Sequence, residues 1–255
     1  MQKIGTGGSE SAIDASFTGH LTLPSTASLC TINRIGGNAF LNCEGLTSIT
    51  IPNTIVSIEY FEEFDGSASP FTGCSNLTSI YSHIEVPFAT DSRAFDGIPT
   101  NATLYVPHGT KQVYENTPGW NRFTSIVERR YKGDIMTAAT TEGITMTFVI
   151  TDEDAKTCQV GTGKYNASAI DMETSGIVTI PTSVEGFRVT HIANYAFSEC
   201  ANIEKVVIPE GIETMGYSVF DGCINLQSAN FPNSLIEIDG DLPFDGCQNL
   251  KNSYC

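Results

Sequence analysis

A short internal repeat is the feature that most constrains how this chain can fold. A full copy reads Leu-x-x-Ile-x-Ile-Pro, with other apolar residues at some of these positions, continues with two apolar residues at steps of three, and ends in Phe-x-x-Cys. The pattern starts at Leu46, Leu77, Ile203, Leu226 and Leu250, and the last three starts are 23 and 24 residues apart. One coil of ~23 residues cannot bury its own apolar face, so the coils must stack into a solenoid.

The spacing within each repeat predicts its local structure. The last two apolar residues of Leu-x-x-Ile-x-Ile are two apart, which is the period of a strand with one buried face. The proline that follows ends the strand, because it has no amide hydrogen to donate. The three-residue steps indicate a turn or a loose 3₁₀-like return path. Asp-Gly pairs such as Asp96-Gly97 and Asp221-Gly222 are expected to close the coil.

A longer period shows that the repeats occur in two tandem copies. Residues of the first copy recur 157 positions later, and the pairs are Pro24 and Pro181, Phe40 and Phe197, Cys43 and Cys200, Leu46 and Ile203, and Pro52 and Pro209. From Cys74 and Cys223 onward the offset is 149, because eight extra residues lie within 59–70. We therefore predict a first solenoid over residues 1–128, a linker over 129–142 and a second solenoid over 143–255.

The segments between the repeats are expected to close the open ends of the stacks. Residues 144–160 alternate apolar and polar side chains on either side of an acidic turn, which predicts a β-hairpin that caps the second solenoid. A short helix over 110–116, followed by Trp120, Phe123 and Ile126, is expected to close the first solenoid. Both ends of the sequence fall within a coil, so we expect the chain to be a piece of a longer protein.

Two of the units read LTSITIPNTIVSIEYFEEF and IEKVVIPEGIETMGYSVFDGC. They resemble the BspA-like subfamily of leucine-rich repeats, which are surface proteins of bacteria. Residues 102–128 are similar to the segment that closes such repeats, and residues 143–161 to the hairpin that opens a repeat domain. The pattern departs at 78–94, where Ser82-His83-Ile84-Glu85-Val86 replaces the apolar-Pro step, so this coil is expected to be irregular.

The resemblance carries expectations about fold, location and partners. It implies a leucine-rich-repeat solenoid of right-handed β/irregular coils, with a parallel one-sided sheet in each of two tandem copies. It also implies export to the cell surface or secretion, although the first residues lack the layout of a secretory signal. The expected partner is a host or neighbouring-cell protein or glycan, bound in adhesion.

Charge and hydropathy exclude two other classes of partner. With 13 Lys and Arg against 29 Asp and Glu, the net charge of −16 repels phosphate backbones, so no nucleic-acid partner is expected. No apolar run approaches the ~20 residues that cross a bilayer, so no membrane-spanning segment is expected in this chain.

Searches for catalytic and cofactor motifs favour a chain that is not an enzyme. G-x-S-x-G and H-E-x-x-H motifs are absent. The glycine pairs at Gly5-x-Gly7 and Gly161-x-Gly163 lack the spacing of a phosphate-binding loop and are interpreted as loop tips. We therefore predict no catalytic residue and no cofactor. A glycan-processing enzyme stays as an alternative, which requires a pair of carboxylates in a cleft.

Five cysteines occupy one equivalent position in successive coils. They are Cys43, Cys74, Cys200, Cys223 and Cys247. A residue that recurs with the apolar pattern is most simply a small buried hydrophobe, so we predict reduced, structural thiols and no metal site. Stacked cysteine pairs and metal ligands remain the alternatives.

Two surfaces are candidates for binding. The residues between the apolar positions of the strands are expected to point outward as stacked rows, and they are Ser48, Thr50, Ser79, Tyr81, Lys205, Val207, Ser228 and Asn230. The extra residues within 59–70 supply Tyr60, Phe61 and Phe64 as a second candidate patch. Each has an alternative: a merely soluble sheet face for the first, and an aromatic flap folded onto the core for the second.

The favoured function is therefore a non-enzymatic recognition or adhesion protein that binds through its solenoid surface. The alternative is a structural spacer without a ligand of its own. Fold alone does not decide between them.

Overall fold

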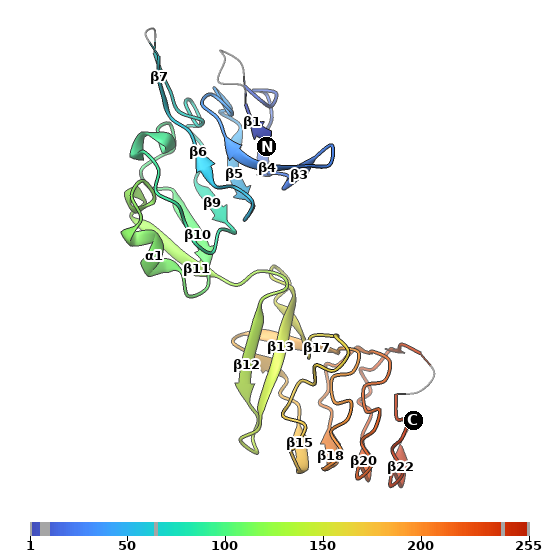
Figure 1. Cartoon of the computed structure of the whole chain (residues 1–255). Coiled ribbons are helices and arrows are strands. Elements are labelled where there is room, and N and C mark those ends of the chain that lie inside the picture. The colour runs from blue at the N-terminus through green and yellow to red at the C-terminus, as the bar shows by residue number, and fades with distance from the viewer. Residues whose placement is uncertain (1, 6–10, 64–65, 241–242, 254–255) are drawn as a thin grey trace. The chain divides into compact units, whose positions relative to one another are not determined.

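The computed structural model describes residues 2–5, 11–63, 66–240 and 243–253. The chain divides into two compact units, Met1–Arg129 and Arg130–Cys255. Each unit is a stack of coils with a hydrophobic core of its own (Figure 1).

A five-stranded parallel sheet runs through the first unit. Its strands in spatial order are β11 (Ser125–Arg129), β10 (Thr103–Pro107), β9 (Ser79–Ser82), β5 (Leu46–Ile51) and β2 (Gly19–Thr22). Ile49 lies opposite Ile80, which in turn lies opposite Leu104. All three side chains are fully buried. The parallel sheet with one buried face, predicted from the repeat, is confirmed.

The return path of several coils is more regular than expected. A second ladder joins β1 (Gln2–Ile4), β4 (Cys30–Ile35) and β6 (Ser57–Ile58) in parallel, and β3 (Thr26–Ala27) pairs antiparallel with β4. The predicted turn after the proline is present, with the Ile55 amide donating to the Pro52 carbonyl at 3.2 Å, but the path then continues into a short strand that was not expected. The hydrogen bonds of this ladder form between coils, so the spacing within one coil gives no sign of them.

Stacked phenylalanines fill the core of the first unit. The rings of Phe40 and Phe71 are 5.4 Å apart and those of Phe71 and Phe95 are 6.2 Å apart, and all three are fully buried. Trp120 closes the end of this stack, with its ring 4.9 Å from that of Phe95. Its indole NH donates to the carbonyl of Phe88 at 2.9 Å.

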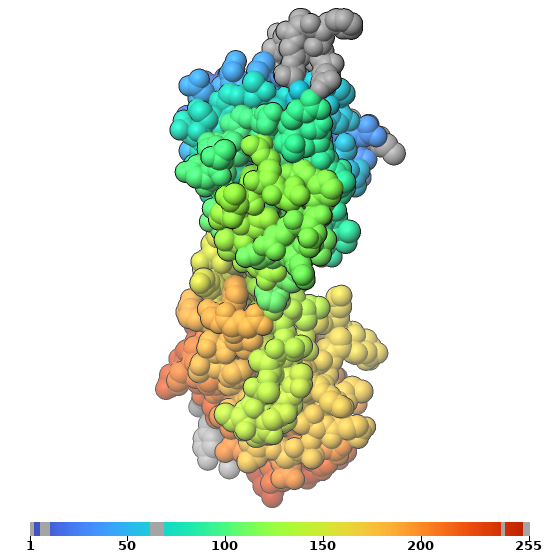
Figure 2. Space-filling model, turned by 90° about the vertical axis from the view of Figure 1, so that its left-hand side faces the viewer, coloured from blue at the N-terminus to red at the C-terminus, as the bar shows by residue number. Residues whose placement is uncertain are grey.

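The closing segment contains the expected helix. Helix α1 (Lys111–Asn116) is followed by the 3₁₀ turn η2 (Trp120–Arg122), and a further turn, η1 (Ser92–Phe95), precedes them. In Figure 2 the closing segment, in green, faces the viewer below the blue and cyan coils of the first unit. Phe123 and Ile126 of this segment are buried in the core of the first unit, as predicted.

The irregular coil at 78–94 has a physical explanation. Ser82 stands opposite Ile51, at a buried position that an apolar residue fills in the coil before. Its hydroxyl lies 2.6 Å from the hydroxyl of Tyr114, which donates to the carbonyl of Ile84 at 2.7 Å. Tyr114 of helix α1 therefore satisfies the buried Ser82 hydroxyl. The serine in place of an apolar residue and the tyrosine on the closing helix thus belong together.

The second unit repeats this architecture. Its parallel sheet contains β15 (Gly176–Thr179), β18 (Ile203–Val207), β20 (Ser228–Ala229) and β22 (Asn252–Ser253). Val206 lies opposite Ala229, as predicted, whereas Ile208 and Phe231 lie just beyond the ends of their strands. The rings of Phe197, Phe220 and Phe244 stack at 5.4 and 5.2 Å.

The predicted hairpin opens the second unit. β13 (Thr145–Asp152) pairs antiparallel with β14 (Thr157–Val160), and β14 then pairs in parallel with β17 (Phe187–Ile192). The ladder continues through β19 (Thr214–Met215) and β21 (Glu237–Ile238), while β16 (Ser183–Val184) pairs antiparallel with β17. The hairpin thus adds its strands to the ladder of β17, β19 and β21, which lies on the return path of the coils.

Part of the expected linker is ordered structure. Residues 135–139, which we placed in the linker over 129–142, form β12 (Ile135–Ala139), and β12 pairs antiparallel with β13. The side chain of Met136 is buried there. The guanidinium of Arg130 also donates to the Glu185 carboxylate at 2.9 Å. Sparse apolar residues suggested a free segment, but backbone pairing with β13 orders it.

Candidate functional site

The outward residues of the five-stranded sheet form two rows in register. One row comprises His20, Ser48, Ser79, Thr103 and Ser125, and the other comprises Thr22, Thr50, Tyr81, Tyr105 and Val127. With Arg129, these rows are called the first-unit sheet face. Strand pairing therefore places the four candidates that the sequence named in this unit side by side. All four are half-buried among their neighbours.

Aromatic rings stack on the first-unit sheet face. The rings of Tyr81 and Tyr105 are 4.7 Å apart and nearly parallel, at 11°. His20 approaches Tyr81 edge-on at 5.9 Å, and the Arg129 guanidinium lies 5.3 Å from the Tyr81 ring centre. Two tyrosine rings and a guanidinium thus lie together on a surface whose other residues are mostly serine and threonine.

Hydroxyl groups hold the His20 ring in place. Its Nδ1 lies 2.7 Å from Ser48 Oγ, and its Nε2 lies 3.1 Å from both Thr22 Oγ1 and Thr50 Oγ1. Sequence reasoning missed His20, because its strand lacks the full Leu-x-x-Ile-x-Ile pattern. It also missed Tyr105, although the alternation of buried Ala102, Leu104 and Val106 was a usable signal.

The candidates in the second unit are arranged differently. Lys205 and Ser228 are opposite each other on β18 and β20, and Val207 is opposite Thr179. Asn230 lies beyond β20, where its amide donates to the carbonyl of Ile208 at 2.8 Å and accepts from the Ile208 amide at 3.0 Å. With these two bonds the Asn230 side chain joins the backbone of the preceding coil just beyond the paired strands.

The insertion forms a β-hairpin of β7 (Phe61–Glu63) and β8 (Gly66–Ala68). Cations cover both described aromatic residues. The Arg93 guanidinium lies 4.3 Å from the ring centre of Tyr60, and Lys3 Nζ lies 5.3 Å from that of Phe61. Tyr60 also packs against the core of the first unit. Phe64, the third predicted residue of this patch, lies outside the described residues.

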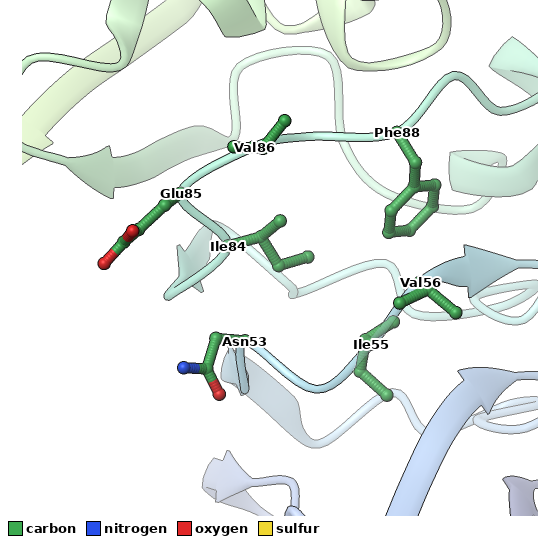
Figure 3. Close-up of a pocket in the computed structure, with 7 residues that line it drawn as sticks. All are labelled: Asn53, Ile55, Val56, Ile84, Glu85, Val86 and Phe88. Carbon is green, nitrogen blue, oxygen red and sulfur yellow. The ribbon is translucent and has the colours of Figure 1, made fainter. Parts of the chain in front are cut away.

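A hollow with a volume of about 350 Å³ lies where the irregular coil after β9 passes the loop after β5 (Figure 3). Its lining consists of Asn53, Ile55, Val56, Ile84, Glu85, Val86 and Phe88. Val86 is 81% exposed, so the rim is open. Figure 3 shows the Glu85 carboxylate pointing away from Ile84 and Phe88. The lining thus supplies one titratable side chain.

A second hollow, of about 530 Å³, lies in the second unit beside β13 and is lined by Ile144, Thr145, Thr147, Ser168, Ala169, Ile170, Asp171 and Thr174. Neither of these two hollows brings together the pair of carboxylates that glycoside hydrolysis uses. The described residues hold no group of three or more His, Cys, Asp or Glu placed to bind a metal ion. In the described part of the chain, no helix has the length and apolar character to cross a membrane.

Three of the ladder cysteines donate to a backbone carbonyl of the preceding coil. Cys74 Sγ donates to the carbonyl of Phe40 at 3.1 Å, and Cys223 Sγ donates to that of Phe197 at 3.0 Å. Cys247 is half-buried and makes the same bond to Phe220 at 3.2 Å. Cys43 and Cys200 instead lie next to serine hydroxyls, with Sγ 3.4 Å from Ser11 Oγ and 3.2 Å from Ser168 Oγ. The five ladder cysteines are free thiols, as predicted.

The comparison with known protein families agrees with this arrangement of coils. The model of the BspA type leucine rich repeat region matches residues 13–117 and 177–255, in six copies. The chain belongs to this family. The resemblance inferred from the repeat units, and the solenoid fold it implies, are thereby confirmed.

Several solved structures are similar to this BspA-type chain. A leucine-rich repeat protein from Eubacterium ventriosum is 20% identical over 92% of this chain, with a TM-score of 0.33. The chain spans 60% of that protein's length. A leucine rich cell surface protein from Faecalibacterium prausnitzii is 14% identical, covering 88% of this chain and 69% of its own, with a TM-score of 0.26. The pneumococcal vaccine antigen PcpA is 15% identical, covering 96% and 74%, with a TM-score of 0.29. No curated protein matches the chain.

The thiols of these BspA-type repeats are expected to resist alkylation in the native protein. Burial raises the pKa of the Cys74 thiol to about 12, and it also raises the pKa of Cys223. At pH 8 the native protein therefore holds almost no reactive thiolate at these positions, whereas the exposed Cys30 reacts. Iodoacetamide labelling read by peptide mass spectrometry should modify Cys74 and Cys223 only after denaturant is added. Failure of either to react in denaturant would indicate a disulfide and contradict the assignment.

Proposed function

We propose that this chain is a non-enzymatic recognition protein, located at the cell surface or secreted, that binds a host or neighbouring-cell protein or glycan. The proposed contact surface is the first-unit sheet face. The observation that supports it most is the outward stack of Tyr81 and Tyr105 with Arg129 beside it. Tyrosine and arginine are the residues that most often dominate the energy of protein contacts.

The size and chemistry of the surface fit an extended ligand. Five strands at about 4.8 Å spacing give rows about 19 Å long. The row of hydroxyls on Ser48, Ser79, Thr103 and Ser125 offers groups that both donate and accept hydrogen bonds. Such groups suit the polar faces of glycans as well as the backbone of a protein. We place the second-unit candidates Lys205, Val207 and Ser228 outside this main contact.

The alternative, a spacer without a ligand, requires only a soluble surface. Charged side chains would serve that purpose, whereas stacked tyrosines on an open sheet face add nothing to solubility. A specific observation thus favours recognition over the spacer.

Tyr81→Ala is expected to weaken binding at least tenfold, because it removes the ring that stacks on Tyr105 and contacts His20 and Arg129. The ligand is first found by screening the chain on an array of glycans and matrix proteins, and its affinity is then measured for each variant. Val113→Ala is the matched control, because Val113 is exposed on α1 in the same unit and lies off the sheet.

Two outcomes would count against this proposal. Equal affinity of the Tyr81→Ala variant and the parent chain would place the contact elsewhere. A chain that binds nothing on the array would favour the spacer. Proteolytic shaving of intact producing cells tests the location, since a surface protein releases its peptides without lysis.

A further inference from the structure

Three tyrosines form a row along the second unit, and the middle one, Tyr195, is half-buried. Tyr165, Tyr195 and Tyr217 meet edge to face, with ring centres 5.2 and 5.0 Å apart. Tyr165 is 70% exposed and Tyr217 is 42% exposed. The amide of Tyr195 donates to the carbonyl of Tyr217 at 3.3 Å, so these two rings come from neighbouring coils. This tyrosine row is distinct from the first-unit sheet face.

Carboxylates from the same coils accompany the tyrosine row. The amide of Glu199 donates to the carbonyl of Asp221 at 2.7 Å, and the amide of Gly222 donates to that of Asp245 at 3.0 Å. Glu199 and Asp221 are thus in register on successive coils. Glu199 follows Tyr195 by four residues, and Asp221 follows Tyr217 by four. A hydrogen bond with Tyr217 raises the pKa of Tyr195, and the Asp221 charge adds to the rise.

Comparison of the two copies shows that the backbone does not require these side chains. At the offset of 157, Tyr195 corresponds to Asn38 and Glu199 to Asn42. All four residues have left-handed backbone, with φ of 57° and 59° for the first pair and 61° and 56° for the second. Asparagine tolerates this conformation well, whereas tyrosine and glutamate are strained in it.

The backbone role is also the same in both copies. The backbone amides of Asn38 and Asn42 donate to the backbone carbonyls of Ser69 and Thr72 in the next coil. Those of Tyr195 and Glu199 donate in the same way to Tyr217 and Asp221. Folding alone would be served better by asparagine at both positions. The ring and the carboxylate therefore meet a requirement other than folding.

We propose that the tyrosine row binds an extended segment of a partner protein rich in lysine and arginine. Cations bind the faces of exposed tyrosine rings, and the neighbouring carboxylates complement their charge. The three rings span about 10 Å, which is the length of about three residues of extended chain.

The charge of the second unit favours the same partner. Residues 130–255 hold 17 of the 29 Asp and Glu but only 7 of the 13 Lys and Arg. A basic segment is therefore attracted to this unit before it makes contact. The inference concerns a different surface from the proposed function and does not depend on it.

The test uses the full chain and a fluorescent octapeptide of alternating lysine and serine, with binding followed by fluorescence anisotropy. Tyr195→Asn, which restores the residue of the first copy, is expected to weaken binding about tenfold. Because this change removes no charge, the loss cannot reflect a change in net charge. Relief of backbone strain should at the same time raise the unfolding midpoint of the second unit, so weaker binding will not reflect unfolding.

Controls distinguish the row from general attraction of a basic peptide. Glu199→Asn should also weaken binding, whereas Glu204→Gln, which removes an exposed carboxylate from β18, should leave it nearly unchanged. A peptide of alternating glutamate and serine should not bind. Unchanged affinity in both Tyr195→Asn and Glu199→Asn, or equal binding of the acidic peptide, would overturn the proposal.

Discussion

Phe71→Ala is expected to lower the free energy of unfolding of the first unit by about 3–5 kcal/mol. The Phe71 ring lies between those of Phe40 and Phe95 in the middle of the core stack, and it is fully buried. Truncation removes its contacts with both neighbouring coils. The rings on either side are held by their own coils and cannot move together to fill the cavity.

Trp120 allows this effect to be measured in one unit alone. It is the only tryptophan of the chain and is buried in the core of the first unit. Denaturant unfolding followed by tryptophan fluorescence should therefore shift to lower denaturant in Phe71→Ala. Phe220→Ala is the matched control, because Phe220 has the same place in the stack of the second unit.

This pair of variants also tests our proposal that the two solenoids are separate domains. Each unit has its own core, so Phe220→Ala should leave the tryptophan transition in place while it shifts part of the circular dichroism signal. A tryptophan transition that moves equally in both variants would mean that the units unfold together.

Gly97→Ala is expected to destabilise the first unit by about 3–5 kcal/mol, for two reasons that add. Gly97 has a φ of 97°, which strains any residue with a Cβ. A Cβ atom at this position would also collide with the backbone carbonyl of Phe71 and lie 2.9 Å from the Cα of Thr72. Backbone in the neighbouring coil cannot yield as a flexible side chain can.

Gly109→Ala separates strain from collision. Gly109 has a similar φ of 82°, but a Cβ there meets nothing within 4 Å. Its substitution should cost only about 1 kcal/mol, from the strained conformation alone. Both variants are measured by the fluorescence of Trp120. Equal effects at the two glycines would show that contact between the coils does not determine the difference.

The repeat spacing determined the fold class and most of the buried residues. Leu-x-x-Ile-x-Ile places Ile49 and Val206 on the inner face of a strand whichever coil lies beside it, and both are fully buried. The hairpin before the second solenoid was likewise visible in the sequence. These features depend on contacts within one coil, or on the repetition of equal coils, and both leave a periodic trace.

The candidate binding surface was only partly predictable. Alternation along the strands identified Tyr81 as outward, but strand pairing decided that it stacks on Tyr105 and meets His20. The tyrosine row had no sequence signal, because Tyr195 and Tyr217 occupy loops where the repeat pattern fixes no side chain.

Only the tertiary structure decided which coil satisfies each polar group. The thiol of Cys74 bonds to Phe40, and the hydroxyl of Ser82 bonds to Tyr114, across 34 and 32 residues respectively. The second ladder of short strands is also made of bonds between coils. A periodic sequence specifies which side chains face inward. It does not specify the donors and acceptors that stacking brings together, because those contacts join residues of different coils, one repeat or more apart.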